Sequence, residues 1–359
     1  MNEFKGTVRI VGAGLLGTSI GLALTKQGAD VIITSRSKSS ADLAISYGAG
    51  RAPVNGDNPS VIIVCVPPRL TAQVVADELR QFPTATVTDV ASIKVAILQE
   101  LKFLGAPIER YVGSHPMAGR ERGGAISGRA DLFVGRPWVI TTHEKSDATR
   151  ITEIENLAKA LDSSPIKIDA NNHDRAVALV SHAPQVISSL LASRLIDGEA
   201  SDISLAGQGL RDTTRIAASD PELWVQILAG NNKEVLSVLK NFETDLEKLI
   251  KSLESADSVE ADNAILKVLE SGNRGVERIP GKHGTKHSRY AQIVVMIDDK
   301  PGELGRLFAE VGEIGINIEE LQLEHSPSAE IGLVELFVKP ENERILVDDL
   351  VARGWRIAG

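Results

Sequence analysis

The chain has 359 residues, and at about 150 residues per domain this length predicts two or three domains. A composition of 43% hydrophobic and 24% charged residues is typical of globular proteins, whereas 4% aromatic residues disfavours a stacking platform for single-stranded nucleic acid. The net charge of −9, without long runs of like charge, disfavours binding to duplex nucleic acid or to an anionic membrane.

Cysteine content and apolar runs bear on the compartment. Cys65 is the single cysteine of the chain, which excludes an internal disulfide framework and favours a reducing compartment. The first residues lack the basic region of a signal peptide, and no apolar run approaches the ~18 residues of a membrane span. We therefore expect a cytoplasmic protein with no membrane or nucleic-acid partner.

Residues 1–170 are predicted to form an α/β domain, because short β-branched runs alternate with amphipathic segments. Such alternation predicts a parallel sheet with helices on both faces. The expected strands are residues 8–11, 31–34, 61–66, 85–90, 138–142 and 166–168. The expected helices include residues 15–27, 70–82 and 93–104.

Residues 171–280 are predicted to form an all-helical domain, since apolar residues recur there every three or four positions. The expected helices include residues 172–195, 222–229 and 233–253. A long apolar stripe favours packing against a second subunit, and the alternative is the core of a single-chain bundle. The stripe consists of Val235, Leu236, Leu239, Phe242, Leu246, Leu249 and Leu253.

The remaining residues divide into a linker and a small α+β domain. Residues 281–289 lie in a stretch rich in glycine and basic residues, which is typical of a linker. Residues 290–359 are predicted to follow a βαββαβ order. Its expected strands are 291–297, 317–323, 332–338 and a short one at 355, and its expected helices are 302–314 and 343–353.

A glycine-rich motif follows the first predicted strand and opens the first helix. Its first glycine permits a tight turn, its second lets a pyrophosphate approach the backbone, and its third allows close packing of helix and strand. The motif therefore predicts a dinucleotide site, to which we also assign Val66 at the end of a strand. The motif reads Gly12-Ala13-Gly14-Leu15-Leu16-Gly17.

The end of the second predicted strand bears on the choice of dinucleotide. An NAD enzyme usually places a carboxylate there, against the ribose 2′-hydroxyl. Here the strand is followed by Ser35, Arg36, Ser37 and Lys38, whose cations and hydroxyls suit a 2′-phosphate. We predict NADP, with NAD as the alternative cofactor and a solvated loop as the alternative role of these residues.

Three polar clusters are expected at the carboxyl edge of the sheet, where ligands bind in open α/β folds. They are residues 89–94, residues 113–121 and residues 181–185. His115 stands in a glycine- and proline-rich segment, which favours a catalytic histidine over a packed one. His182 lies within a helix, so a structural role and contact with substrate stay open. No histidine has the spacing and carboxylate neighbours of a metal site.

Two arginines precede the expected helix that contains Trp224. Arg211 and Arg215 are four residues apart, and on one helical face they could clamp a dicarboxylate. The alternative is a solvated charged face in which Asp212 pairs with one of them.

Five ordered motifs carry a resemblance to a known family. They are the Gly12–Gly17 loop, Asp89-Val-Ala-Ser-Ile-Lys, Ser114-His-Pro-Met-Ala-Gly-Arg-Glu, Ser181-His-Ala-Pro, and Arg211-Asp-Thr-Thr-Arg-Ile-Ala with Pro221 and Trp224. Over residues 6–280 the chain resembles the prephenate/arogenate dehydrogenase family of tyrosine biosynthesis. The resemblance implies a Rossmann domain, a helical dimerisation domain and a homodimer. It also implies oxidative decarboxylation of prephenate with a nicotinamide cofactor.

The resemblance also implies roles for single residues. His115 matches the catalytic histidine that accepts the proton of the C4 hydroxyl, and Ser92 matches a serine that bonds this histidine or the cofactor. Arg215 matches the arginine that binds the substrate carboxylate. Supporting positions around the pocket are Glu121, Asp212 and Trp224, and we add His182 and Arg211 as substrate contacts.

One position departs from a common form of the family motif and bears on the substrate. Gln185 replaces a histidine that many members carry. Arogenate has an ammonium where prephenate has a keto oxygen, and a buried ammonium needs a carboxylate partner. Because Gln185 is neutral, we predict prephenate as the substrate, with arogenate as the alternative.

Residues 290–359 resemble an ACT domain, through Asp299-Lys-Pro-Gly-Glu-Leu-Gly and Gly315-Ile-Asn-Ile. The resemblance implies an amino-acid site at Pro301, Gly302, Leu304 and Asn317, with tyrosine as the expected effector. The alternative is a ligand-free dimerisation module. For the whole chain, the alternatives are another Rossmann dehydrogenase and, in a different class, a nucleotide-binding amino-acid sensor without catalysis.

Overall fold

The computed structural model describes residues 4, 6–119, 123–255, 258–280, 290–325 and 331–358. The chain forms two compact units, each made of two segments. The first unit consists of Met1–Gly198 and Thr213–Phe242, and the second consists of Glu199–Asp212 and Glu243–Gly359. The predicted linker 281–289 and Glu121 lie outside the described residues.

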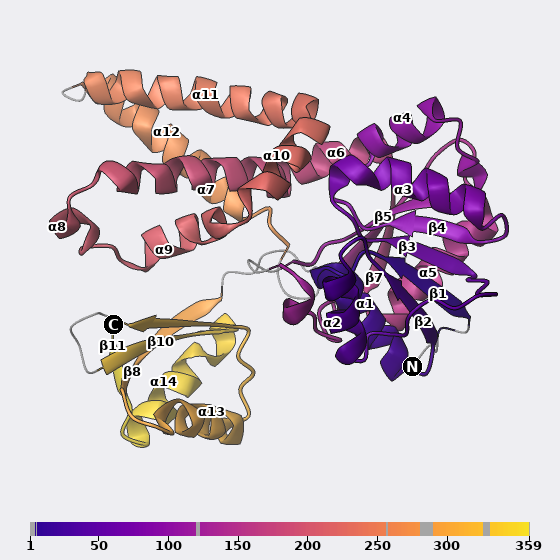
Figure 1. The fold of residues 1–359 in the computed structure, drawn as a ribbon. Helices are drawn as coiled ribbons and strands as arrows, with labels where there is room; N and C mark the ends of the chain where they lie inside the picture. The colour runs from indigo at the N-terminus through magenta and orange to yellow at the C-terminus, as the bar shows by residue number, and fades with distance from the viewer. Residues whose placement is uncertain are drawn as a thin grey trace. The chain divides into compact units, whose positions relative to one another are not determined.

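The first unit is built on a sheet with the strand order β2-β1-β3-β4-β5-β6-β7 (Figure 1). The strands are β1 (Thr7–Val11), β2 (Asp30–Thr34), β3 (Val61–Val64), β4 (Thr86–Asp89), β5 (Tyr111–Pro116), β6 (Pro137–Thr142) and β7 (Ser164–Asp169). Neighbouring strands are parallel except β5 and β6, which pair antiparallel.

The expectation of a parallel sheet is therefore wrong for the β5–β6 pair. No strand range was predicted for β5, although the cluster 113–121 was expected to end a strand. A parallel neighbour needs a crossover connection, usually a long helix, whereas only the 3₁₀ turn Ala125–Ser127 is assigned as helix in the described part of the β5–β6 connection. The β5 sequence, Tyr-Val-Gly-Ser-His-Pro, lacks a β-branched run and so gives no strand signal.

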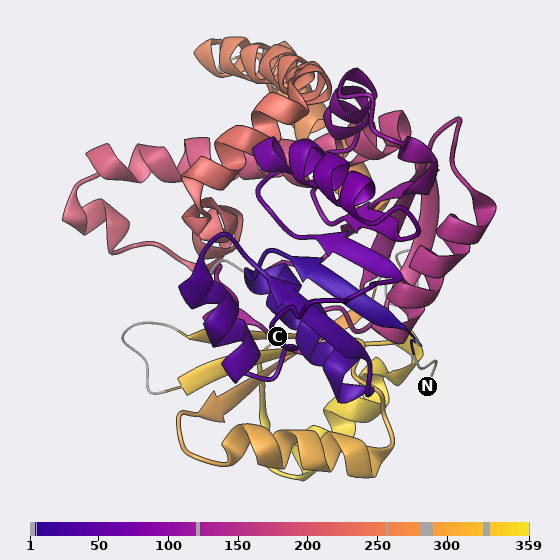
Figure 2. The ribbon, with the colours of Figure 1, turned by 45° about the vertical axis from the view of Figure 1, so that its right-hand side comes forward.

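Helices cover both faces of this sheet (Figure 2). Alternate residues of β3 divide between two cores: Val61 and Ile63 join one, and Ile62 and Val64 the other. The first core includes residues of α1 (Leu15–Lys26), α2 (Lys38–Ser46) and α5 (Ala148–Ala160). The second includes residues of α3 (Pro68–Gln81) and α4 (Val95–Phe103), and also Ile227 from the later helix α10 (Pro221–Gly230).

A long helical segment leaves the sheet directly after β7. The Asp169 carboxylate caps it by accepting the backbone N–H of Asn172 at 3.0 Å. The segment consists of α6 (Ala170–Val177), a π-helical turn (Ala178–His182), α7 (Ala183–Ser193) and the 3₁₀ turn Arg194–Asp197. The 3₁₀ turn η5 (Arg215–Ala218) packs against α7, and α11 (Asn232–Glu254) follows α10.

This segment, Ala170–Asp197, is long and apolar enough by length and composition to cross a membrane. From the sequence, we expected no apolar run long enough for a membrane span. Its buried residues include His173, Asp174, His182 and Gln185, which make polar contacts inside the first unit. A core helix of a globular protein passes the same test, and the buried polar side chains favour that role here.

The second unit contains an antiparallel sheet with the strand order β11-β8-β10-β9. Chain order in its last part is β8 (Ala291–Asp298), α13 (Glu303–Ile314), β9 (Glu320–His325), β10 (Ile331–Val338), α14 (Glu343–Ala352) and β11 (Arg356–Ala358), which confirms the βαββαβ order. One apolar core joins α13 and α14 to the sheet. The unit also holds α8 (Ala200–Ile203), most of α9 (Gln208–Thr214) and α12 (Val259–Val276).

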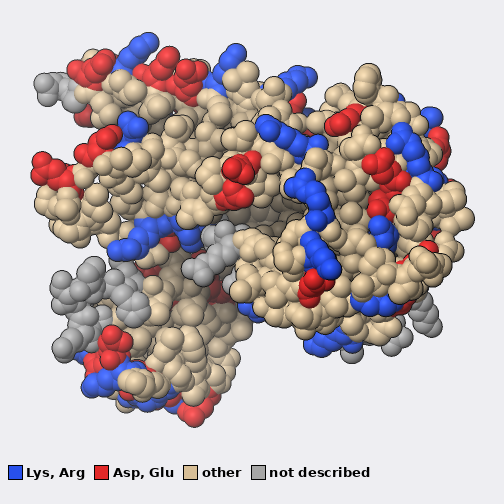
Figure 3. Space-filling view, viewed as in Figure 1, with Lys and Arg blue, Asp and Glu red and all other residues tan. Residues whose placement is uncertain are grey.

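Charges are mixed on the surface of the molecule. Figure 3 shows Lys and Arg interspersed with Asp and Glu over the face that it presents.

Candidate active site

The glycine motif forms the turn between β1 and α1. Gly12 has a φ of +117°, and a Cβ on it would lie 2.2 Å from the backbone oxygen of Cys65. A Cβ on Gly17 would lie 2.0 Å from the backbone oxygen of Gly12, so both positions require glycine. A Cβ on Gly14 would meet nothing within 4 Å, and no side chain caps α1, whose first turn begins at Leu15 and Leu16. This open cradle at a helix N-terminus fits a dinucleotide pyrophosphate.

The predicted ribose contacts lie after β2. Ser35 is half-buried, whereas Arg36 and Lys38 are exposed. Ser37 caps α2, because its Oγ accepts the backbone N–H of Ser40 at 3.3 Å. At the end of β3, the backbone oxygen of Val66 accepts the Thr71 hydroxyl at 3.4 Å.

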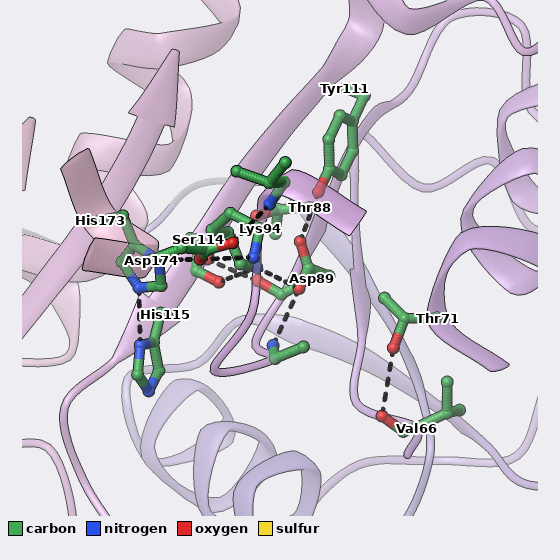
Figure 4. Close-up of polar contacts among 12 residues, drawn as sticks. Val66, Thr71, Thr88, Asp89, Lys94, Tyr111, Ser114, His115, His173 and Asp174 are labelled. Carbon is green, nitrogen blue, oxygen red and sulfur yellow. Dashed lines mark hydrogen bonds and ion pairs between the residues drawn. The ribbon is translucent and has the colours of Figure 1, made fainter. Parts of the chain in front are cut away.

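His115 is a strand residue and not the loop residue that its sequence suggested. It lies in β5, opposite Val139 of β6, and is 9% exposed. Its Nδ1 lies 2.9 Å from Nε2 of His173, and Nδ1 of His173 lies 2.8 Å from Oδ1 of Asp174 (Figure 4). His115, His173 and Asp174 therefore form a continuous hydrogen-bonded chain, which we call the relay.

The N-terminus of α4 sets the direction of the relay. The Asp174 carboxylate accepts the backbone N–H groups of Lys94 and Val95, each at 2.9 Å. Because this carboxylate accepts, Nδ1 of His173 donates to it, and Nε2 of a neutral His173 must then accept. His115 consequently donates from Nδ1, which leaves its Nε2 unprotonated. The relay thus presents a base at one defined atom.

The protonation of His115 agrees with that role. Burial lowers the pKa of His115 well below 6.5, and the nearby His173, Lys94 and His182 lower it further. The imidazole is therefore neutral at neutral pH and able to accept a proton.

A buried polar cluster holds β5 in place beside the relay. The Lys94 ammonium forms an ion pair with Asp89 and donates to the backbone oxygen of Ser114 at 2.6 Å. The Tyr111 hydroxyl donates to the other oxygen of Asp89 at 2.7 Å, and the Ser114 hydroxyl donates to the Asp89 backbone oxygen at 2.7 Å (Figure 4). Burial lowers the pKa of Lys94 and raises that of Tyr111. These bonds fix the backbone that carries His115.

The relay limits how Ser92 can contact His115. Ser92 is half-buried between β4 and α4. Nδ1 of His115 is occupied by His173, so a bond from Ser92 to His115 would have to reach Nε2, and this alternative stays a prediction. Contact between Ser92 and the cofactor stays a prediction.

The helical part of the first unit brings further predicted residues together. His182 is fully buried in the π-helical turn, a distortion that often marks a functional site. Its ring meets Trp224 of α10 edge-to-face, with centroids 6.0 Å apart. Gln185, which is 6% exposed, lies in the first turn of α7, and its Nε2 donates to Ser189 Oγ at 3.4 Å.

The two arginines lie in adjoining helical elements, and their joint role as a clamp stays a prediction. Arg211 lies in α9, which ends at Thr214, whereas Arg215 begins the 3₁₀ turn η5. Ser188 Oγ, in α7, donates to the backbone oxygen of Thr213 at 2.7 Å. This bond ties the end of α9, two residues before Arg215, to α7. Asp212 accepts from Gln208 at 2.8 Å. Arg211 and Asp212 belong to the second unit and Arg215 to the first.

Sequence reasoning missed three residues of this site, namely His173, Asp174 and Asn231. The histidine and aspartate stand in the first turns of a helix that follows a strand directly, and this position was a usable signal. Asn231, after α10, donates from Nδ2 to the backbone oxygen of Asp174 at 2.7 Å and lies 3.1 Å from Nδ1 of His182. Nothing in its sequence surroundings marks it.

Comparisons with known proteins agree with this geometry. Residues 20–166 match the family model "Prephenate dehydrogenase, nucleotide-binding domain", and residues 169–268 match "Prephenate dehydrogenase, dimerization domain". The chain is 33% identical to the probable prephenate dehydrogenase NovF of Streptomyces niveus, over 97% of this chain and 98% of that protein. It is 30% identical to the cyclohexadienyl dehydrogenase of Zymomonas mobilis, over 72% of this chain and 91% of that protein.

Two solved structures are also similar. The prephenate dehydrogenase of A. aeolicus, in complex with hydroxyphenyl propionate and NAD+, superposes with a TM-score of 0.68 at 25% identity, over 77% of this chain and 98% of that one. The arogenate dehydrogenase of Synechocystis gives a TM-score of 0.63 at 27% identity, over 76% of this chain and 99% of that one.

Proposed function

This chain belongs to the prephenate dehydrogenase family, and we propose that it catalyses the oxidative decarboxylation of prephenate to 4-hydroxyphenylpyruvate, with His115 as the general base. It is an NAD(P)-dependent dehydrogenase of the tyrosine pathway. The observation that carries the role of His115 is the relay, which leaves an unprotonated nitrogen on a neutral, buried imidazole.

The chemistry needs one proton acceptor beside the C4 hydroxyl of the substrate. Bound NAD(P)+ supplies the acceptor for the C4 hydride. Nε2 of His115 accepts the hydroxyl proton as the C4 oxygen becomes a carbonyl. As CO2 leaves, the electron pair of the broken C–C bond makes the ring aromatic and passes to the C4 oxygen, which recovers a proton from His115 to form the phenol. The relay favours proton transfer to His115, because the positive charge on His115 is stabilised through His173 by the Asp174 carboxylate.

The substrate is held by groups of the helical part of the first unit. We assign Arg215 to the substrate carboxylate, since its guanidinium suits bidentate binding. Its position at η5, which packs against α7, supports this assignment. Trp224 supplies an apolar wall beside His182. Glu121, Arg211 and Asp212 remain predictions, and Glu121 lies outside the described residues.

Cofactor preference is the first testable part of the proposal. The exposed cations after β2 support NADP, with NAD as the alternative. Arg36→Asp is expected to lower the NADP:NAD ratio of kcat/KM by about 10- to 100-fold, because a charge-assisted bond to the 2′-phosphate is lost. Steady-state rates with both cofactors measure this ratio. Lys26→Asp is the control, because Lys26 is exposed at the end of α1 and the substitution makes the same charge change. It should leave the NADP:NAD ratio of kcat/KM unaltered. Equal ratios in both variants would contradict the assignment.

Substrate preference depends on Gln185. Its buried, neutral amide supports prephenate over arogenate, since no carboxylate is provided at that position for an ammonium. Gln185→Glu is expected to raise the arogenate:prephenate ratio of kcat/KM by about 10-fold or more. Rates with both substrates, each with NAD and NADP, measure the ratio. Ser193→Asp, about two turns further along α7, serves as a control for added negative charge. An unchanged ratio in Gln185→Glu would exclude contact with the side-chain end of the substrate.

Regulation is proposed for the second unit. The βαββαβ order supports an ACT-like domain, and Gly302 takes a φ of +94° in the turn that precedes α13. We propose that Pro301, Gly302, Leu304 and Asn317 bind tyrosine as a feedback effector. Asn317→Ala is expected to raise the tyrosine concentration for half-inhibition by about 10-fold. Asn342→Ala, in the same unit, is the control. Equal inhibition of both variants would place the effect of tyrosine at the active site.

Assembly and compartment complete the proposal. Exposed apolar residues along α11 support a homodimer formed through the helical domain, and disfavour the alternative of a single-chain core. They include Leu236, Phe242, Leu246 and Leu253. The family's biosynthetic role supports a cytoplasmic location.

A further inference from the structure

The two ring nitrogens of His182 have very different surroundings. Nδ1 lies 3.1 Å from Nδ2 of Asn231. Nε2 is buried and has no hydrogen-bond partner among the residues that the structure describes. Buried polar atoms of proteins almost always have a partner, so an unpaired one on a histidine near His115 calls for an explanation.

Asn231 determines which of these nitrogens carries the proton. Its Nδ2 donates to the backbone oxygen of Asp174 at 2.7 Å, and a carbonyl oxygen can only accept. The atom is therefore the amide nitrogen and not the amide oxygen. An amide nitrogen cannot accept, so Nδ1 of His182 must accept its second N–H. A neutral His182 then carries its proton on Nε2.

The charge state of His182 agrees with this tautomer. Burial lowers the pKa of His182 to about 4, although the nearby Asp174 carboxylate opposes the shift. At neutral pH the ring is thus neutral, with an N–H at Nε2. This N–H is the atom that has no partner.

We propose that His182 is a fixed hydrogen-bond donor to an oxygen of the substrate, and that Asn231 is the positioning residue that sets its tautomer. The inference rests on the proposed function for the identity of the ligand. Asp174 then controls both histidines of the pocket: its carboxylate acts through His173 on His115, and its backbone oxygen acts through Asn231 on His182. His115 presents a lone pair, and His182 presents an N–H. Their opposite polarity suits a substrate that gives up a proton at one end and is held by an oxygen at another.

The first test reads the tautomer in the free enzyme and needs no turnover. Histidine labelled with nitrogen-15 is incorporated, and His182 is assigned by comparison with the His182→Gln spectrum. We expect a protonated Nε2 and an unprotonated Nδ1 at pH 7. A protonated Nδ1, or rapid exchange between the two tautomers, would overturn the proposal. This result is independent of whether prephenate proves to be the substrate.

The second test inverts the polarity at Asn231. In Asn231→Asp the carboxylate accepts from Nδ1, so the proton of His182 moves away from Nε2 and the substrate oxygen faces a lone pair. We expect KM for prephenate to rise about 10- to 100-fold, with a smaller change in kcat, because binding before the chemical step is weakened. The tautomer of this variant should be reversed in the same nitrogen-15 spectrum.

The neighbouring Asn232→Asp is the matched control, since Asn232 is exposed at the start of α11. It introduces the same charge one residue away and should leave KM and tautomer unchanged. Thermal unfolding of both variants shows whether Asn231→Asp is folded. Equal KM values in the two folded variants would refute the role of Asn231. An enzyme that turns over no prephenate at all would refute the proposed function and leave the tautomer result valid.

Discussion

Replacing His115 with asparagine is expected to lower kcat by about 10²–10⁴-fold, the usual contribution of a general base. Asparagine can still donate to His173 from its amide, so the relay keeps a partner, but no group remains that accepts a proton. Because the lost step belongs to the transition state, KM for prephenate should change little. Steady-state rates at saturating NAD(P)+ measure the loss, and a kcat within threefold of the unmodified enzyme would refute the role of His115.

The pH dependence of activity is a second test of His115 as the base. Burial depresses the pKa of His115, so the base stays unprotonated below the ordinary histidine range. Activity of the unmodified enzyme should therefore persist below pH 6.5 and fall as the pH drops further, through the depressed pKa. This acid limb should be absent from the residual activity of His115→Asn.

His143→Asn is the matched control for this variant. His143 follows β6, where its Nε2 contacts the backbone oxygen of Tyr111 at 3.1 Å, and it has no contact with the relay. The substitution makes the same chemical change at a half-buried histidine and should leave kcat within threefold. A large loss in the control would show that kcat responds to packing at this strand and not to a base.

Replacing Asp174 with asparagine is expected to lower kcat by a similar factor, about 10²–10⁴-fold. Oδ1 of Asp174 accepts from both Nδ1 of His173 and the backbone N–H of Lys94. An asparagine that keeps its amide oxygen there preserves the tautomer, but it lacks the negative charge that stabilises a protonated His115. An asparagine that places its amide nitrogen there donates to His173 Nδ1, which reverses the relay and puts the proton of a neutral His115 on Nε2. Either orientation weakens His115 as a base without touching it.

The same substitution also weakens the fold, and this effect must be separated from catalysis. The carboxylate accepts two backbone N–H groups at the start of α4, and an amide satisfies one of them. We expect a loss of about 1–3 kcal/mol in the free energy of unfolding. Thermal unfolding therefore accompanies the rate measurements, which are made where the variant is folded. Asp169→Asn, at the exposed cap of α6, is the control and should retain kcat. A folded Asp174→Asn enzyme with unaltered kcat would exclude the relay.

The strongest sequence predictions were those governed by short-range rules. The turn at Gly12, the contact of Gly17 with the Gly12 backbone and the helix that follows are set by local sterics, and the motif predicted all three. Hydrophobic periodicity predicted β3, α10 and the βαββαβ order of the last domain for the same reason. Where local preference was silent, as in β5, sequence reasoning found a functional motif but assigned His115 to a loop.

By itself, the sequence determined the dinucleotide loop and the candidate base, because each depends on residues a few positions apart. Only the tertiary structure decided what makes His115 a base. His115 and His173 are 58 residues apart, Lys94 and Asp174 are 80 apart, and His182 and Asn231 are 49 apart. The tautomer of a histidine depends on which atoms fill the space around its ring. That arrangement arises when β5, α4, α6 and α10 pack together, and no local pattern encodes it.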